Sequence, residues 1–131
     1  GSSCGYIKGS QLDQPVDFDS LRRNGKSLGS GAVLVLNETH NMVDQVQQIL
    51  HFMCHESCGK CTPCREGLYQ ACQLIDKFAA SQGTEQDLQM LQSLFELMSK
   101  DCFCALGQGA LTAFVSAYEN FPEDFAERMV K

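Results

Sequence analysis

The stretch from residue 58 to residue 64 reads CGKCTPC, and it places Cys58, Cys61 and Cys64 at equal intervals of three. A helical pattern of apolar residues precedes this stretch and another follows it, so the cysteines lie on a loop between two helices. Three sulfurs so close together are typical of a zinc ion, an iron–sulfur cluster, a redox pair or a disulfide. The rest of the chain has to decide among these four chemistries.

Capping residues predict where the helices around this loop begin. Asn41 suits the N-cap of the helix that precedes the loop. Thr62 suits the N-cap of the helix that follows it, and Pro63 suits its first turn, where proline is tolerated. Thr84 followed by Asp87 resembles a capping box, which predicts the start of a third helix.

Apolar stripes along these helices predict a mainly α-helical domain over residues 41–131. A fourth stripe follows the sequence DCFCALGQG and ends before Pro122, and residues 122–131 are expected to add a last short helix. Four amphipathic helices with short links predict an antiparallel four-helix bundle. The predicted core faces are Val43, Val46, Ile49, Leu50 and Met53; Leu68, Ala71, Cys72, Ile75, Phe78 and Ala79; Leu88, Leu91, Leu94, Phe95 and Met98; and Leu111, Phe114, Val115 and Tyr118.

Residues 1–40 differ from the rest because they are rich in turn-forming residues. Residues 17–23 are expected to form one short helix that Asn24 and Gly25 close. Residues 32–37 read AVLVLN, a short apolar run rich in β-branched residues, which predicts a strand. This strand needs a partner, so we expect residues 1–40 to be a lead-in segment, the end of a domain that lies upstream of this chain.

Composition excludes several classes of function. The formal net charge is −6 at pH 7 and the pI is near 4.9, so the chain lacks the basic face that binding to nucleic acid or an anionic membrane requires. No apolar run approaches the roughly 20 residues of a membrane helix, so we expect no direct membrane insertion. No signal peptide opens the chain, so we expect a cytoplasmic location, or the cytoplasmic or matrix side of a membrane complex, where disulfides are rare.

The spacing of the three cysteines favours an iron–sulfur cluster. Zinc sites usually take two well-separated Cys-x-x-Cys pairs, whereas the two pairs here share a sulfur, as in the overlapping run of bacterial ferredoxins. A fourth ligand has to come from elsewhere, and spacing alone leaves Cys102 and Cys104 as alternatives. Gly59 allows backbone amides to approach sulfur closely. Lys60 and Arg65 are expected to offset the negative charge of the thiolates.

Two competing sites are less well supported. A redox pair would leave the third cysteine of the loop without a role. His51, His55 and Cys58 have the spacing i, i+4 and i+7, which suits zinc. We interpret both histidines as surface residues, because no carboxylate is placed in sequence as a clear partner for them.

Three longer stretches carry a family resemblance. HESCGKCTPCREG at residues 55–67, CALGQGA at residues 104–110 and LDQPVDFDSLRRNGKSLGSGAVLVLNE at residues 12–38 resemble the C-terminal part of the NADH-binding flavoprotein subunit of respiratory complex I. The same segment occurs in related hydrogenase and formate dehydrogenase subunits.

This resemblance implies a [4Fe–4S] cluster held by Cys58, Cys61, Cys64 and Cys104, on a helical domain that relays electrons in a NAD(P)H-linked oxidoreductase. It implies that the FMN and NAD(P) sites belong to a missing upstream part, so this chain alone is not expected to be catalytic. Other iron–sulfur subunits of a multi-subunit oxidoreductase are the implied partners. The remaining cysteines are interpreted as structural or free: Cys4, Cys54, Cys72 and Cys102. The alternative function is a structural zinc module, with four cysteine ligands, for protein interaction.

Overall fold

The helices of the computed structural model account for most of the chain beyond residue 41, and the structure describes residue 1 and residues 3–130. A short 3₁₀ helix, η1, covers Gly9–Gln11. The α-helices are α1 (Phe18–Arg23), α2 (Met42–Glu56), α3 (Thr62–Ala79), α4 (Glu85–Asp101), α5 (Ala105–Gly109), α6 (Thr112–Asn120) and α7 (Pro122–Glu127). The protein is therefore mainly helical, as the apolar periodicity predicts.

Two of the three predicted caps are observed, but the prediction that Thr62 caps α3 is wrong, because Cys61 is the N-cap and Thr62 is the first residue of the helix. The side chain of Asn41 accepts a hydrogen bond from the backbone N–H of Val43 at the start of α2. Thr84 and Asp87 form a complete capping box at the start of α4. Local sequence thus determines the helix starts, because a capping side chain satisfies backbone N–H groups that have no partner within the helix.

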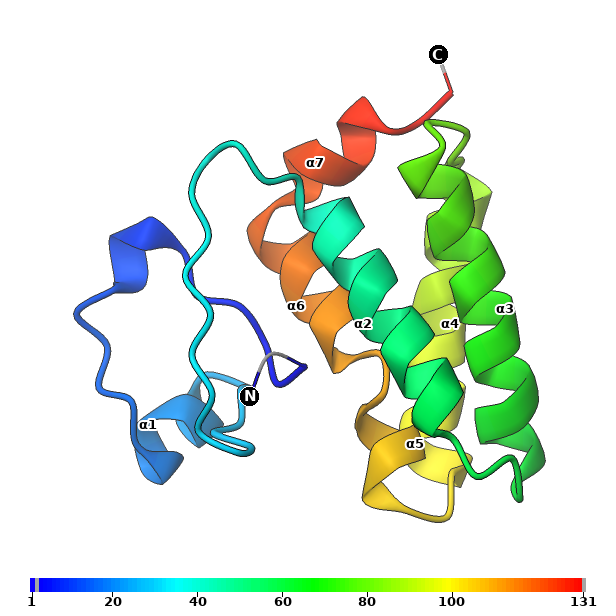
Figure 1. Ribbon diagram of the computed structural model, residues 1–131, viewed down its shortest axis with the longest axis horizontal. Coiled ribbons are helices and arrows are strands. Elements are labelled where there is room, and N and C mark those ends of the chain that lie inside the picture. The colour runs from blue at the N-terminus through cyan, green and yellow to red at the C-terminus, as the bar shows by residue number, and fades with distance from the viewer. Residues whose placement is uncertain (2, 131) are drawn as a thin grey trace.

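The four longer helices pack in a ring of contacts, in which α2 contacts α3 and α6, and α4 contacts α3 and α6. Successive long helices run in opposite directions, and α5 lies at the same end as the loop between α2 and α3 (Figure 1). The prediction of a four-helix bundle describes only part of this arrangement. Helix α5 packs on α3 and α4, and α7 packs on α2 and α6, so both belong to the helical domain.

Most of the large buried side chains of the domain come from the faces that the sequence predicts, and Phe125 on α7 is an addition that it does not. Large side chains that are almost fully buried are Val43, Val46, Leu50, Leu68, Ile75, Phe78, Leu88, Leu91, Met98, Leu111, Phe114 and Phe125. Burying each of them contributes about 1.5–3 kcal/mol of transfer free energy, so this core is the main stabilising feature of the domain. Within the described residues no helix combines the length and the apolar character needed to cross a membrane.

The predicted strand over residues 32–37 is wrong. The structure has no strand in the part of the chain that it describes, and only an isolated bridge joins Gly83 to Met129. Residues 32–37 have no regular secondary structure, and Val35 is 86% exposed. A strand requires a neighbouring backbone for its hydrogen bonds, and no described segment supplies one here.

The lead-in segment lies against the helical domain on the side of α2 and α6 (Figure 1). The backbone N–H of Tyr6 donates to the hydroxyl of Ser116 in α6 at 2.8 Å. The ammonium of Lys8 lies 5.8 Å from the ring centre of Phe121, just before α7. These contacts place residues 5–8 on the bundle, so the lead-in segment is positioned although it contains little regular structure.

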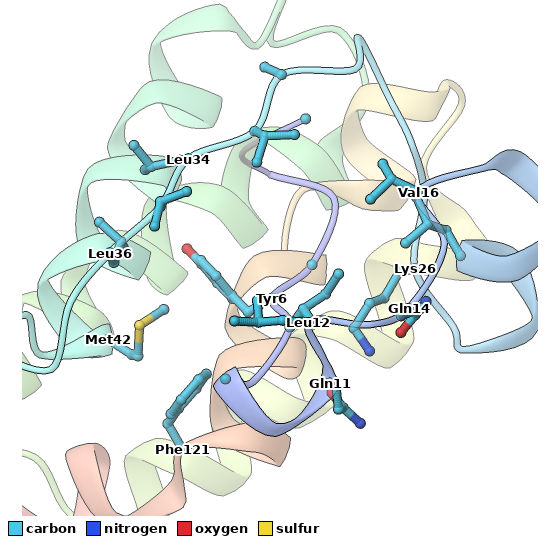
Figure 2. A pocket seen from close by; sticks show the side chains of 18 of the residues that line it. Tyr6, Gln11, Leu12, Gln14, Val16, Lys26, Leu34, Leu36, Met42 and Phe121 are labelled. Atoms are coloured by element: carbon cyan, nitrogen blue, oxygen red, sulfur yellow. The ribbon is translucent and has the colours of Figure 1, made fainter.

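A cavity of about 670 Å³ lies between the lead-in segment and the bundle. Its lining includes Tyr6, Leu34, Leu36, Met42 and Phe121, as Figure 2 shows. The hydroxyl of Tyr6 is buried and has no hydrogen-bond partner among the described residues, and burial raises the pKa of Tyr6 to about 12. None of the cysteines lines this cavity, so it is separate from the site that the sequence predicts.

Candidate metal centre

Three buried cysteines converge at the end of the bundle where α2, α3, α4 and α5 meet. The sulfurs of Cys61, Cys64 and Cys102 lie within 4.8 Å of one another. Two of these residues come from the predicted loop, and the third comes from the end of α4, about 40 residues later in the chain. The group therefore depends on the tertiary fold as well as on the local cysteine spacing.

The loop between α2 and α3 positions the first two sulfurs. Helix α2 ends at Glu56, and Gly59 then adopts a φ of +68°, which is unfavourable for residues with a side chain. Cys61 is the N-cap of α3 and Cys64 lies in its first turn, so both sulfurs belong to the start of one helix. The hydroxyl of Ser57 lies 3.2 Å from the sulfur of Cys64.

The link between α4 and α5 positions the third sulfur. Cys102 caps the C-terminus of α4, and Cys104 is the N-cap of α5. The side-chain amide of Gln108 donates to the carbonyl of Cys102 at 2.9 Å. Gly107 packs directly on the site, since a Cβ at this position would lie 2.8 Å from the sulfur of Cys102 and 3.3 Å from Cβ of Cys64. A glycine is therefore needed for α5 to approach the cysteines so closely.

Backbone amides lower the pKa of one thiol of the group, whereas burial raises the pKa of another. The pKa of Cys61 is lowered, first by the backbone N–H of Phe103 and then by that of Cys64. Burial, and then the negative charge of Cys61 and Cys64, raises the pKa of Cys102 to about 12.

The side chain of Arg65 holds the loop by a hydrogen bond to the loop's backbone. Its guanidinium donates to the carbonyl of Gly59 at 2.7 Å and also pairs with the carboxylate of Glu66 at 2.9 Å. Lys60 is exposed. The expectation that these two cations offset the charge of bound thiolates stays a prediction, and the structure adds that Arg65 restrains the conformation of the loop.

The structure separates the predicted ligands into two groups. Cys61 and Cys64 lie together, whereas Cys58 and Cys104 are exposed and lie outside the close group. Cys102, which the resemblance leaves without a role, lies beside the two buried sulfurs. Sequence reasoning also passed over Ser57 and Gly107. The CALGQGA motif contains Gly107, but nothing local shows what an added side chain would contact.

The two histidines near the loop are exposed, as predicted. One part of that reasoning was wrong, because a carboxylate partner does exist for His51. Its Nε2 atom lies 2.8 Å from Oδ1 of Asp76 on α3, a contact between helices that sequence spacing cannot reveal. Partial burial acts to raise the pKa of Asp76, but hydrogen bonds from Gln47 and His51 outweigh this effect and lower it.

The chemistry of the donors narrows the choice of metal. The buried group contains thiols alone, and soft sulfur ligands select zinc, copper(I) or iron–sulfur clusters. Sulfurs on one tetrahedral zinc ion, with Zn–S bonds of about 2.3 Å, are separated by roughly 3.8 Å. The close group is compatible with that spacing, so the geometry of the cysteines is not evidence for iron over zinc.

Comparison with known families distinguishes between a zinc site and an iron–sulfur site. The family described as the NADH-ubiquinone oxidoreductase-F iron-sulfur binding region matches residues 44–128, which span α2 to α7 and include every cysteine of the site. The chain belongs to this family. An iron–sulfur binding region is thus favoured over a structural zinc module.

Individual relatives of this iron–sulfur binding region agree with the assignment. A NADH-quinone oxidoreductase subunit of Rhizobium meliloti (strain 1021) is 39% identical over 125 residues, which cover 95% of this chain and 30% of that protein. NADP-reducing hydrogenase subunit HndC of Solidesulfovibrio fructosivorans is 34% identical, over 95% of this chain and 26% of that protein.

A solved structure has the same fold. A chain in the crystal structure of a NAD⁺-reducing [NiFe]-hydrogenase in the H₂-reduced state superposes with a TM-score of 0.85 and 29% identity. The match covers 99% of this chain and 22% of the other. The present chain therefore spans less than a third of the length of each of these three similar proteins.

Proposed function

We propose that this chain relays single electrons through a [4Fe–4S] cluster held by Cys58, Cys61, Cys64 and Cys104. The observation that carries the proposal is the convergence of Cys61 and Cys64 with Cys102 of the α4–α5 link, inside the segment that matches an iron–sulfur binding region. When bound, such a cluster accepts and donates one electron at a time. No carboxylate or imidazole lies in the close group, which suits thiolate ligation.

The protein's own residues prepare the site for a negatively charged group. The amides of Phe103 and Cys64 point at the sulfur of Cys61, so they favour its thiolate form. Ser57 lies within hydrogen-bonding distance of Cys64. Hydrogen bonds to cluster sulfurs are one of the factors that set the reduction potential, so we expect these residues to affect it.

The identity of the fourth ligand is the sharpest test. The resemblance assigns Cys104, whereas the structure places Cys102 nearest to Cys61 and Cys64. A four-iron cluster bonds each thiolate to a different iron, so its ligands do not have to touch one another, and an exposed Cys104 two residues away stays available.

We would reconstitute the Cys102→Ser and Cys104→Ser variants without oxygen and measure iron and sulfide per chain. Cys104→Ser should lose the four-iron signal in electron paramagnetic resonance, and Cys102→Ser should keep it, with Cys4→Ser as the control in the lead-in segment. The opposite result would assign the fourth position to Cys102. Zinc retained in place of iron by every variant would support the zinc module.

We also propose that the parent protein is a NAD(P)H-linked oxidoreductase subunit whose FMN and nucleotide sites lie upstream of residues 1–40. The implied partners are other iron–sulfur subunits, and the implied location is the cytoplasmic or matrix side. The exposed residues 32–35 support this arrangement, because they present apolar side chains and unpaired backbone groups. Limited proteolysis should cleave this segment in the present chain and spare it in a longer form that includes the upstream part. Equal cleavage in both would contradict this placement.

A further inference from the structure

Three thiols at the end of the bundle form a compact donor group that differs from the proposed cluster ligands. The sulfurs of Cys61, Cys64 and Cys102 lie within 4.8 Å of one another, and all three residues are buried. The proposed cluster uses Cys58 and Cys104, both of them exposed, in place of Cys102. The chain therefore offers two overlapping sets of sulfur donors, which share two cysteines and differ in the use of Cys102.

The close group has the size of a site for a single metal ion. Sulfurs that share one tetrahedral zinc ion, with Zn–S bonds of about 2.3 Å, are roughly 3.8 Å apart. The three sulfurs are already within 4.8 Å of one another, so small side-chain rotations are enough to place an ion between them. Soft thiolate donors are also the ligands that select zinc among the common divalent ions.

Contacts from outside the group hold the three thiols in place. Cys61 is the N-cap of α3 and Cys64 lies in its first turn, so the start of one helix fixes this pair. The hydroxyl of Ser57 lies 3.2 Å from the sulfur of Cys64, the kind of contact that orients a metal ligand. The side-chain amide of Gln108 donates to the carbonyl of Cys102 at 2.9 Å and so holds the third residue from α5. Because the donors are positioned in advance, an ion has to order little of the chain when it binds.

We propose that the iron-free chain binds one zinc ion through the thiolates of Cys61, Cys64 and Cys102, with the fourth position left for water. Three protein ligands and an open fourth position are a common arrangement for zinc. A bound metal ion deprotonates a coordinating thiol outright, so the burial of Cys102 does not prevent it from acting as a ligand. The ion would join the start of α3 to the end of α4.

One consequence rests on the proposed function, namely that zinc and the cluster exclude each other. Both metal centres need Cys61 and Cys64, so a chain that holds zinc cannot load the cluster until the ion leaves. Cys102 belongs to the zinc set alone. It is therefore the residue through which zinc would delay cluster loading.

The first experiment measures zinc alone, in protein freed of metal by chelation. The chain is dialysed without oxygen against micromolar free Zn²⁺, and zinc per chain is measured by mass spectrometry. We expect about one zinc ion per chain, lost in Cys102→Ser and kept in Cys104→Ser and in the control Cys4→Ser. Iron loading of the same variants should show the reverse pattern, lost in Cys104→Ser and kept in Cys102→Ser.

A second experiment tests whether zinc and the cluster compete. The unsubstituted chain and Cys102→Ser are each incubated with one equivalent of Zn²⁺ and then supplied with iron and sulfide without oxygen. Zinc should reduce the iron loaded per chain severalfold in the unsubstituted chain and leave it unchanged in Cys102→Ser. Equal inhibition of the two proteins would contradict the assigned role of Cys102.

Two results of the zinc measurement would overturn the proposal. Zinc that stays bound in Cys102→Ser, or that fails to bind the unsubstituted chain, would show that the close group is not a zinc site. Zinc lost from both Cys102→Ser and Cys104→Ser would show that the ion uses a cluster ligand. Cys102→Ala decides the matter if circular dichroism shows that Cys102→Ser fails to fold, because a buried methyl group needs no hydrogen-bond partner. Failure of every variant to load iron would bear on the electron relay alone, since zinc is measured in iron-free protein.

Discussion

Replacing Gly107 by alanine tests whether close packing of α5 maintains the cysteine site. The added Cβ would lie 2.8 Å from both Cβ and Sγ of Cys102 and 3.3 Å from Cβ of Cys64. The two Cβ atoms are bonded directly to the backbone, so they cannot move away by rotation of a side chain. We expect the crowding to cost about 1–3 kcal/mol, the usual range for an overpacked core.

Gly109→Ala is the matched control for this substitution. Gly109 lies in the same helix, and an added Cβ would have Oγ1 of Thr112 as its nearest neighbour, at 3.9 Å, an ordinary contact. Both substitutions should gain up to about 1 kcal/mol of helix propensity, so the difference between the two variants isolates the crowding. A difference of 1–3 kcal/mol corresponds to roughly 4–12 °C in Tm for a domain of about this size.

The assay is thermal unfolding followed by circular dichroism, together with iron per chain after gel filtration without oxygen. Gly107→Ala should unfold at the lower temperature and retain less iron, because α5 or Cys102 has to move. If the two variants unfold together and hold equal iron, then the contact between Gly107 and the cysteines does not support the site, and the reasoning is refuted.

Three further results are expected. Asp87→Asn should lower the free energy of unfolding by about 1 kcal/mol at neutral pH. Burial acts to raise the pKa of Asp87, but hydrogen bonds from Lys77 and Thr84 outweigh it and lower the pKa. The carboxylate therefore stabilises the fold above the unfolded pKa of about 4, and this contribution is lost as pH falls through the lower folded pKa. Urea unfolding of both proteins from pH 7 down to pH 3 checks this pH dependence. If the difference in the free energy of unfolding between Asp87→Asn and the parent does not shrink as the pH falls, the assigned role of Asp87 is contradicted. Chelating the iron should leave the far-UV circular dichroism of the helices nearly unchanged, because the apolar core stabilises the bundle without metal, and a collapse of the helical signal would show instead that the cluster holds the domain. With added FMN, this chain should not oxidise NADH with ferricyanide as acceptor, since the flavin and nucleotide sites are expected upstream, and turnover like that of a complete flavoprotein would contradict this placement.

Local sequence determined the helices and the loop that carries most of the site. Asn41, Thr84 and Asp87 satisfy the first N–H groups of their own helices, so the starts of α2 and α4 are visible without any tertiary contact. The spacing of Cys61 and Cys64 is equally local, because three residues are enough to bring their sulfurs to the start of one helix. The same local reasoning failed at residues 32–37, where β-propensity was real but no partner backbone is present in the described chain.

Only the tertiary structure decided which side chains from distant parts of the chain meet. Cys102 reaches Cys61 because α4 returns to the end of the bundle where α3 begins, and no spacing in the sequence encodes that return. Gly107 is required at its position because of what it contacts, which lies on two other segments. His51 and Asp76 are 25 residues apart and meet through the packing of α2 on α3. Capping and periodicity depend on neighbours within a few residues, whereas these contacts depend on how the apolar faces of whole helices pack, which is a property of the assembled core.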